Sequence, residues 1–136
     1  MAYTPFGSWT VEEALTVDAP DGSTVRPLAA LAGLGSLARF ELAPGAVSRA
    51  VSHATVQEIW YVTQGTGLIW RRQNGLAEVT SLRPGTAVTI PLGTAFQFRA
   101  DQGGSPLQIV AVTMPPWPGT DTEARREQGP WDPVSP

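Results

Sequence analysis

Turn-forming residues recur about every ten residues between Pro44 and Gly104, and this spacing constrains the fold more than any other feature of the chain. Glycine and proline favour turns, and the sequence has 14 glycines and 13 prolines among 136 residues. Short segments rich in β-branched and aromatic residues lie between these turns. Such spacing is typical of a β-sandwich or a small barrel, so we predict an all-β fold.

The segments between the turns predict a series of short strands. Asn74-Gly75 favours a type I′ turn, because both residues adopt positive φ readily, and this predicts a hairpin. Alternation in 37–42 places Phe40 on one face and Arg39 on the other. The predicted strands cover residues 37–42, 58–64, 68–72, 76–81, 86–90, 95–100 and 107–114.

The two ends of the chain differ from this middle region. We predict one domain with an irregular N-terminal arm and first strands over 1–36, a barrel core over 37–114 and a proline- and tryptophan-rich tail over 115–136. Thr120-x-x-Glu123 has the spacing of a capping box, which predicts a short helix over 121–127. Trp117 and Trp131 need burial, so we expect them to strap the tail onto the barrel or onto a partner subunit.

Composition excludes several classes of function. The net charge of −3 argues against nucleic acid as a partner. The sequence has no cysteine and no lysine, which excludes disulfides, thiolate nucleophiles and Schiff-base chemistry, and His53 is its single histidine. The N-terminus has no basic start followed by an apolar run, and the longest near-apolar stretch, 28–38, is about half of a membrane span. We therefore expect a soluble, cytoplasmic protein that makes no membrane contact.

Two segments resemble the two sequence motifs of the cupin superfamily. The first has Gly45, five residues, Val51-Ser52-His53, four residues, Glu58, six residues and Gly65. The second has Gly85, five residues, Pro91-Leu92-Gly93, two residues, Phe96, three residues and Ala100. All the turn-making positions of the family match, over about 37–114, and the ending after Met114 is similar to that of small single-domain bacterial cupins. The resemblance implies the cupin double-stranded β-helix, a jelly-roll barrel, here with a short C-terminal helix and irregular termini.

The resemblance also implies a degenerate metal site. Cupins bind their metal through two histidines and a glutamate of the first motif and a histidine of the second. Val51 and Phe96 occupy two of these positions, and only His53 and Glu58 match. Zinc sites usually keep three protein ligands and non-haem iron sites two histidines and a carboxylate, so we expect no cofactor. If iron, nickel, manganese or zinc does bind, the resemblance implies His53 and Glu58 as ligands.

His53 and Glu58 are the candidate catalytic residues. If they keep their family positions they point into the barrel, where an inward carboxylate needs a partner and the imidazole is the obvious one. Together they form a dyad suited to proton transfer near neutral pH. Candidate ligand-binding residues are the aromatic and apolar neighbours by strand alternation and one arginine: Arg39, Val51, Trp60, Val62, Trp70, Phe96 and Phe98.

Three functions remain open on the sequence. The first is a metal-independent isomerase, cyclase or lyase that transfers protons on a small molecule, for which some cupins give precedent. The second is a metal-dependent dioxygenase or isomerase with a third ligand still to be recognised. The third is a non-catalytic module that binds a small apolar or sugar-like ligand. Because small cupins commonly pair their sheets or exchange terminal segments, we also expect a homodimer.

Overall fold

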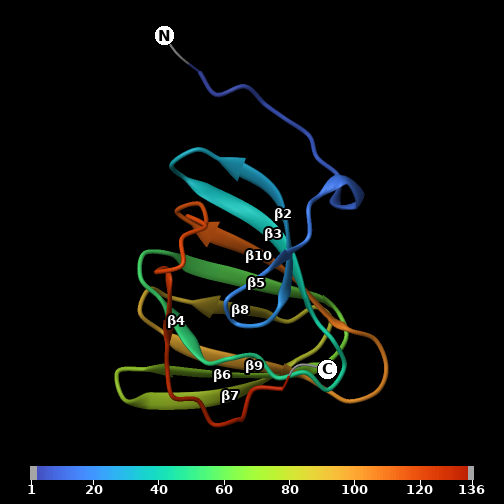
Figure 1. The fold of residues 1–136 in the computed structure, drawn as a ribbon, viewed down its shortest axis with the longest axis vertical. Coiled ribbons are helices and arrows are strands. Elements are labelled where there is room, and N and C mark those ends of the chain that lie inside the picture. Colours follow the sequence, from blue (N-terminus) through green and yellow to red (C-terminus); the bar gives the residue numbers. More distant parts are fainter. Residues whose placement is uncertain (1–2, 135–136) are drawn as a thin grey trace.

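Two antiparallel sheets face each other in a computed structural model that describes residues 3–134 (Figure 1). The first sheet has the order β1 (Val17–Asp18), β2 (Thr24–Leu31), β3 (Gly35–Leu42), β10 (Leu107–Met114), β5 (Gln57–Gln64) and β8 (Ala87–Ile90). The second has the order β11 (Ala124–Arg126), β4 (Val51–His53), β9 (Ala95–Ala100), β6 (Gly67–Gln73) and β7 (Leu76–Leu82). This arrangement is consistent with a cupin jelly roll.

The turn chemistry accounts for most of the strand boundaries. Strands β9 and β10 have the predicted bounds, β5, β7 and β8 differ from the prediction by one residue at one end, and β6 differs by one residue at each end. Asn74 and Gly75 have φ of 52° and 76°, as a type I′ turn requires, and they join β6 to β7. Gly65 also has a positive φ, and a Cβ there would lie 2.5 Å from the carbonyl oxygen of Pro106, so only glycine fits.

The predicted C-terminal helix over 121–127 is wrong. Residues 121–122 form a turn, and β11 follows and pairs antiparallel with β4. The reason is the partner of Glu123, whose carboxylate accepts hydrogen bonds from Thr55 and Val56 rather than capping its own backbone. This segment therefore forms a strand, because it pairs with the free edge of β4 in the second sheet. At the other end of the chain, Val11–Glu13 forms a single 3-10 turn.

Aromatic side chains from both sheets fill the space between them. Along β5 burial alternates strictly, so Glu58, Trp60 and Val62 face inward. The ring of Trp60 meets those of Phe40 and Phe98 edge to face, with centroids 4.8 and 5.0 Å apart. Such pairs stabilise a core by roughly 1 kcal/mol beyond their buried area.

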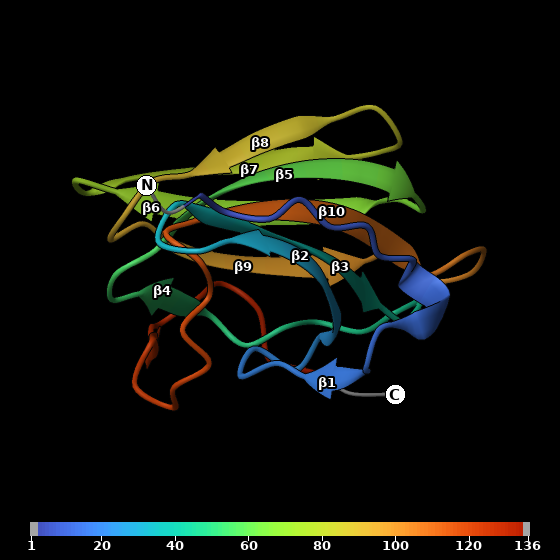
Figure 2. The same ribbon diagram turned by 90° about the horizontal axis from the view of Figure 1, so that it is seen from above.

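The tail returns to the barrel along β4, as Figure 2 shows in red beside that strand. Trp131 packs against a small cluster of Ala50, Trp70 and Ala95 on the outside of the second sheet. The amide of Gln97 donates to the carbonyl of Trp131 and accepts from its N–H, at 2.8 and 3.2 Å. Within residues 3–134, no helix has the length and apolar character needed to cross a membrane. The N-terminal arm extends away from the sheets (Figure 1).

Candidate active site

A largely apolar cavity of about 790 Å³ opens between the two sheets. Its walls come from β2, β3, β5 and β10 of one sheet, from β4 and β9 of the other, and from the tail around Trp117. The volume lies in the range of cavities that hold small molecules, roughly 300–1,000 Å³. Polar side chains also line it, and His53 and Glu58 are among them.

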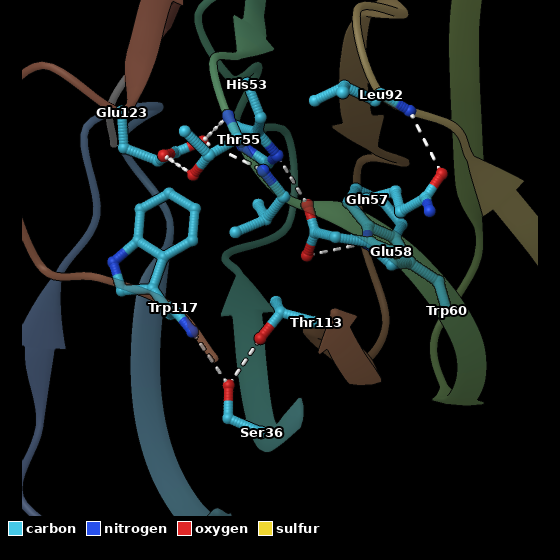
Figure 3. A network of polar contacts seen from close by, with 11 residues as sticks. Ser36, His53, Thr55, Gln57, Glu58, Trp60, Leu92, Thr113, Trp117 and Glu123 are labelled. Carbon is cyan, nitrogen blue, oxygen red and sulfur yellow. Dashed lines mark hydrogen bonds and ion pairs between the residues drawn. The ribbon is translucent and has the colours of Figure 1, made fainter. Parts of the chain in front are cut away.

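The imidazole of His53 and the carboxylate of Glu58 form a buried pair in this wall (Figure 3). His53 ends β4 and Glu58 lies at the start of β5, so the short turn between the strands brings both side chains inward. Nδ1 of His53 lies 3.0 Å from Oε2 of Glu58, and the two residues are 8% and 7% exposed. The indole N–H of Trp60 donates to Oε1 of the same carboxylate at 3.4 Å.

The carboxylate of Glu58 favours a proton on the nearer nitrogen of His53. Nδ1 lies 3.0 Å from Oε2, but the contact does not have the geometry of a hydrogen bond, and Nδ1 has no hydrogen-bond partner among the described residues. The negative charge still favours the neutral tautomer with its proton on Nδ1, which leaves a lone pair on Nε2. The ring is held edge to face between Phe96 and Trp117, with centroids 5.2 and 5.1 Å away. This arrangement suits a general base whose orientation is fixed by an acceptor behind it.

Glu123 holds the turn that joins the two members of the pair. Its carboxylate accepts hydrogen bonds from the N–H and hydroxyl of Thr55 and from the N–H of Val56 (Figure 3), and its carbonyl accepts from Ala54. Burial alone would raise the pKa of Glu123, but these hydrogen bonds and the nearby His53 outweigh it and hold the pKa below its ordinary value. Glu123 is a positioning residue, because it fixes the backbone between His53 and Glu58.

Asp21 is a further carboxyl in the wall of the same cavity. Its Oδ1 accepts hydrogen bonds from the N–H and hydroxyl of Ser23, at 2.9 and 2.6 Å. Burial raises the pKa of Asp21 above its ordinary value although these hydrogen bonds oppose the shift. The charge of Glu58 adds a smaller increase, and His53 opposes it. The site therefore has two carboxyl groups in different environments.

The structure brings together some of the predicted ligand-binding residues and separates others. Val51, Trp60 and Phe96 line the cavity with His53 and Glu58. Val62 and Phe98 are fully buried in the core and are not part of the wall. Arg39 and Trp70 lie elsewhere. Arg39 is on the opposite face of β3, where its guanidinium is 3.5 Å from Glu41, and Trp70 belongs to the cluster under Trp131.

Three residues at the site were not among the predicted ones. The local sequence indicates only an Asp-Gly turn at Asp21, the end of a capping box at Glu123 and a tail anchor at Trp117. The sequence does signal one of them, since an aspartate two residues before a serine is typical of a side chain that bonds the following backbone. Nothing in the sequence connects Glu123 with Thr55, which lies 68 residues away.

The donor atoms at the site do not fit the metal that the cupin motifs imply. Val51 and Phe96, which occupy the two remaining ligand positions, are buried and have no donor atom. Gln57 and Gln97 point away from the cavity, toward Leu92 and Trp131. Across residues 3–134, no three histidine, aspartate or glutamate side chains come together in a way that could hold an ion. We therefore derive no chemistry through a metal.

The fold and the site define a jelly-roll protein with a small-molecule cavity inside its barrel. A family model described as the cupin domain matches residues 38–113, and the chain belongs to this family. No curated protein matches the chain in sequence.

Several solved structures resemble the chain. Pac13 of Streptomyces, described as a unique nucleoside dehydratase, is 15% identical with a TM-score of 0.69, and the match covers 92% of both chains. A Pac13 variant with uridine is also 15% identical, with a TM-score of 0.70, and the match covers 92% of both chains. KdgF from Halomonas sp. is 20% identical with a TM-score of 0.67, over 80% of this chain and 94% of that one. At these identities the likeness establishes the fold alone.

Proposed function

We propose that this cupin is a small-molecule enzyme that transfers protons through His53 and Glu58 without a metal, as a lyase, isomerase or cyclase. The observation that carries the proposal is the 3.0 Å contact between Nδ1 of His53 and Oε2 of Glu58 in the wall of the cavity. A base oriented by a carboxylate is the arrangement that general acid–base catalysis requires.

Each residue of the dyad has a defined task in such a reaction. The charge of Glu58, 3.0 Å from Nδ1, favours a proton on Nδ1, so Nε2 is the atom that takes a proton from the substrate. The imidazolium that forms is stabilised by the same carboxylate, and it returns the proton to another atom of the substrate or to a leaving group. The aromatic wall of Trp60, Phe96 and Trp117 places apolar surface beside the reacting atoms.

The comparisons support this class of reaction without identifying the substrate. Pac13 is described as a nucleoside dehydratase, and a dehydration removes a proton and a hydroxide from one molecule, which is a lyase reaction. Its structures with uridine match 92% of this chain. A cavity of about 790 Å³ has room for a ligand of that size. The metal-dependent alternative receives no support from the donor atoms at the site.

A substrate screen tests the proposal. Wild-type protein is incubated with neutral hydroxy-carbonyl compounds and nucleosides, including uridine, in D₂O, and proton NMR follows deuterium exchange and loss of water. We expect turnover or exchange for at least one compound, and its loss in His53→Ala with ligand affinity retained. Arg39→Ala is the matched control, because Arg39 lies outside the cavity. Binding without any exchange in the wild type would favour the non-catalytic module instead.

We also propose that the protein is a homodimer. The outer face of the first sheet exposes Ile59 and Tyr61 of β5 beside Val112 of β10, with Ile59 directly opposite Val112. Contiguous apolar residues on a sheet face favour pairing with a second copy. Light scattering at tens of micromolar should give twice the mass of the chain, and Tyr61→Glu should shift the mass toward that of one chain. A wild-type monomer would refute this.

A further inference from the structure

The ionisable groups of the cavity are almost all acidic. Glu58 and Asp21 lie in its wall, and Asp18 and Asp121 are also among its lining residues. His53 is the basic side chain there, and it is paired with Glu58. Among the lining residues that the structure describes, there is no arginine, and the sequence has no lysine. A bound anion would therefore have no cation to neutralise it.

The arginines nearest to the cavity are directed elsewhere. Arg26 and Arg39 lie on β2 and β3 between residues that do line the cavity, so strand alternation places their side chains on the other face. Arg39 is paired with Glu41 there. Arg49 reaches the loop before β2, but its guanidinium donates to the carbonyl of Pro20 at 3.0 Å.

Asp21 is held as a fixed polar group facing the cavity. The turn over 19–22 is closed by a hydrogen bond from the N–H of Gly22 to the carbonyl of Ala19, and the N–H of Arg49 donates to the carbonyl of Asp21. Both side-chain hydrogen bonds of Asp21 go to Oδ1, from Ser23. The second oxygen, Oδ2, has no partner among the described residues and is not enclosed by protein, so it is available to a ligand.

We propose that the cavity takes uncharged or cationic ligands that present a hydroxyl or amino group to Asp21, and that it rejects carboxylates and phosphates. The proposal rests on the proposed function and specifies its substrate class.

The physical reason is desolvation beside fixed negative charge. An anion loses its hydration on entering an apolar wall and gains no cation in exchange. A neighbouring carboxylate adds repulsion, which is stronger in a low-dielectric cavity than in water. A hydroxyl or ammonium group meets the reverse situation, because Oδ2 of Asp21 accepts its hydrogen bond. Like-charge contacts of this kind are a recognised source of specificity against the wrong partner.

Three matched probes test the selection: benzyl alcohol, benzylamine and sodium benzoate. They share one ring and differ in charge. Binding to the wild-type protein is followed at about pH 8, where carboxyl groups ordinarily ionise, through the indole N–H resonances of Trp60 and Trp117. We expect the alcohol and the amine to bind at least tenfold more tightly than benzoate. Asp21→Asn should reduce the preference for the alcohol and the amine over benzoate severalfold. Asp121→Asn, at an exposed position of the cavity lining, should also reduce it.

The control is Glu78→Gln, an exposed carboxylate on β7 away from the cavity, which should leave the ratio unchanged. Benzoate binding as tightly as benzyl alcohol would overturn the charge selection and leave the proposed function intact. An equal effect of Glu78→Gln and Asp21→Asn would also overturn it, because the selection would then reflect net charge. No binding of any probe at about 10 mM would contradict both proposals.

Discussion

Nδ1 of His53 and Oε2 of Glu58 lie 3.0 Å apart although their strands, β4 and β5, belong to different sheets. The pair therefore connects the two layers of the barrel at the point where the chain crosses from one to the other. Its geometry depends on the turn over 54–56, which Glu123 holds from the tail. The catalytic hypothesis thus makes predictions about tautomer, stability and pH as well as about turnover.

The first prediction concerns the tautomer of His53. Nitrogen NMR of the neutral imidazole in the wild-type protein should show a protonated Nδ1 and an unprotonated Nε2, because the carboxylate of Glu58 lies 3.0 Å from Nδ1 and favours a proton there. Glu58→Gln keeps the shape but removes the charge, so we expect a mixture of tautomers and a loss of turnover of about a hundredfold or more. A wild-type His53 protonated on Nε2 would contradict the assigned roles.

The second prediction concerns Glu123. Glu123→Gln removes the charge that accepts three hydrogen bonds, so it should lower the free energy of unfolding at pH 7 by about 2 kcal/mol. The pKa of Glu123 is lowered in the folded state, so its contribution is present above the unfolded value of about 4.5 and is lost as the pH falls through the folded pKa. Urea unfolding at pH 7 and at successively lower pH measures this.

The difference between wild type and Glu123→Gln should therefore shrink on acidification. Glu78→Gln, at an exposed position, should change the stability by no more than about 0.5 kcal/mol at any pH. If the Glu123 variant is as stable as the wild type at pH 7, the hydrogen bonds of Glu123 do not hold the turn over 54–56. Because Glu123 acts on His53 and Glu58 through the backbone of this turn, we also expect the His53 resonances to broaden or shift in this variant.

The third prediction concerns Asp21, whose pKa is raised chiefly by burial. The folded state then binds its proton more tightly than the unfolded chain, so stability falls as the pH rises from the unfolded value near 3.8 through the raised folded pKa. Asp21→Asn removes this loss and keeps an oxygen for Ser23. We expect it to be more stable than the wild type at pH 7 by on the order of 1 kcal/mol.

Thermal unfolding across the acidic and neutral range checks this prediction. The advantage of Asp21→Asn should vanish at low pH, where the carboxyl is protonated in both states. A variant less stable than the wild type at every pH would show that the ionised carboxylate is favoured by a partner in the folded protein. Such a result would also weaken the assignment of Asp21 as a ligand-facing group.

The fold was predictable from the sequence because its turns are fixed locally. Residues such as Asn74 and Gly75 adopt their conformation through their own backbone preference, so spacing alone locates the strands between them. Strand β2 was not delimited in advance, since it contains Pro27 and small residues of low strand propensity and has an irregular register there. Strand β11 forms only because it pairs with β4, and the sequence of the tail favoured a helix instead.

The site was predictable only in part, because local sequence places only some of its residues. The resemblance to the first cupin motif placed His53 and Glu58, which lie on either side of one short turn. Asp21 and Glu123 reach the site from segments distant in the chain, and their roles depend on tertiary hydrogen bonds that no local pattern encodes. Gln57 and Gln97 point away from the cavity because strand alternation puts them on the faces opposite to those of Glu58 and Phe96.

The last prediction tests the loss of the metal site directly. Val51 and Phe96 stand at the two ligand positions that the cupin motifs assign to histidine, and both line the cavity beside His53. Wild-type protein incubated with zinc or cobalt and then desalted should retain less than about a tenth of an equivalent by plasma mass spectrometry, since His53 and Glu58 offer two donors where catalytic sites use three. Val51→His combined with Phe96→His restores four donors, so we expect close to one equivalent. Both substitutions place polar rings in a buried wall and should cost about 2–4 kcal/mol of stability without metal, which metal addition should recover in part.

The control is Val62→His with Phe98→His, which adds two histidines to the core away from the cavity. If the wild type instead holds stoichiometric metal that is lost in His53→Ala, a further ligand completes the site. That result would favour the metal-dependent enzyme over the metal-independent one.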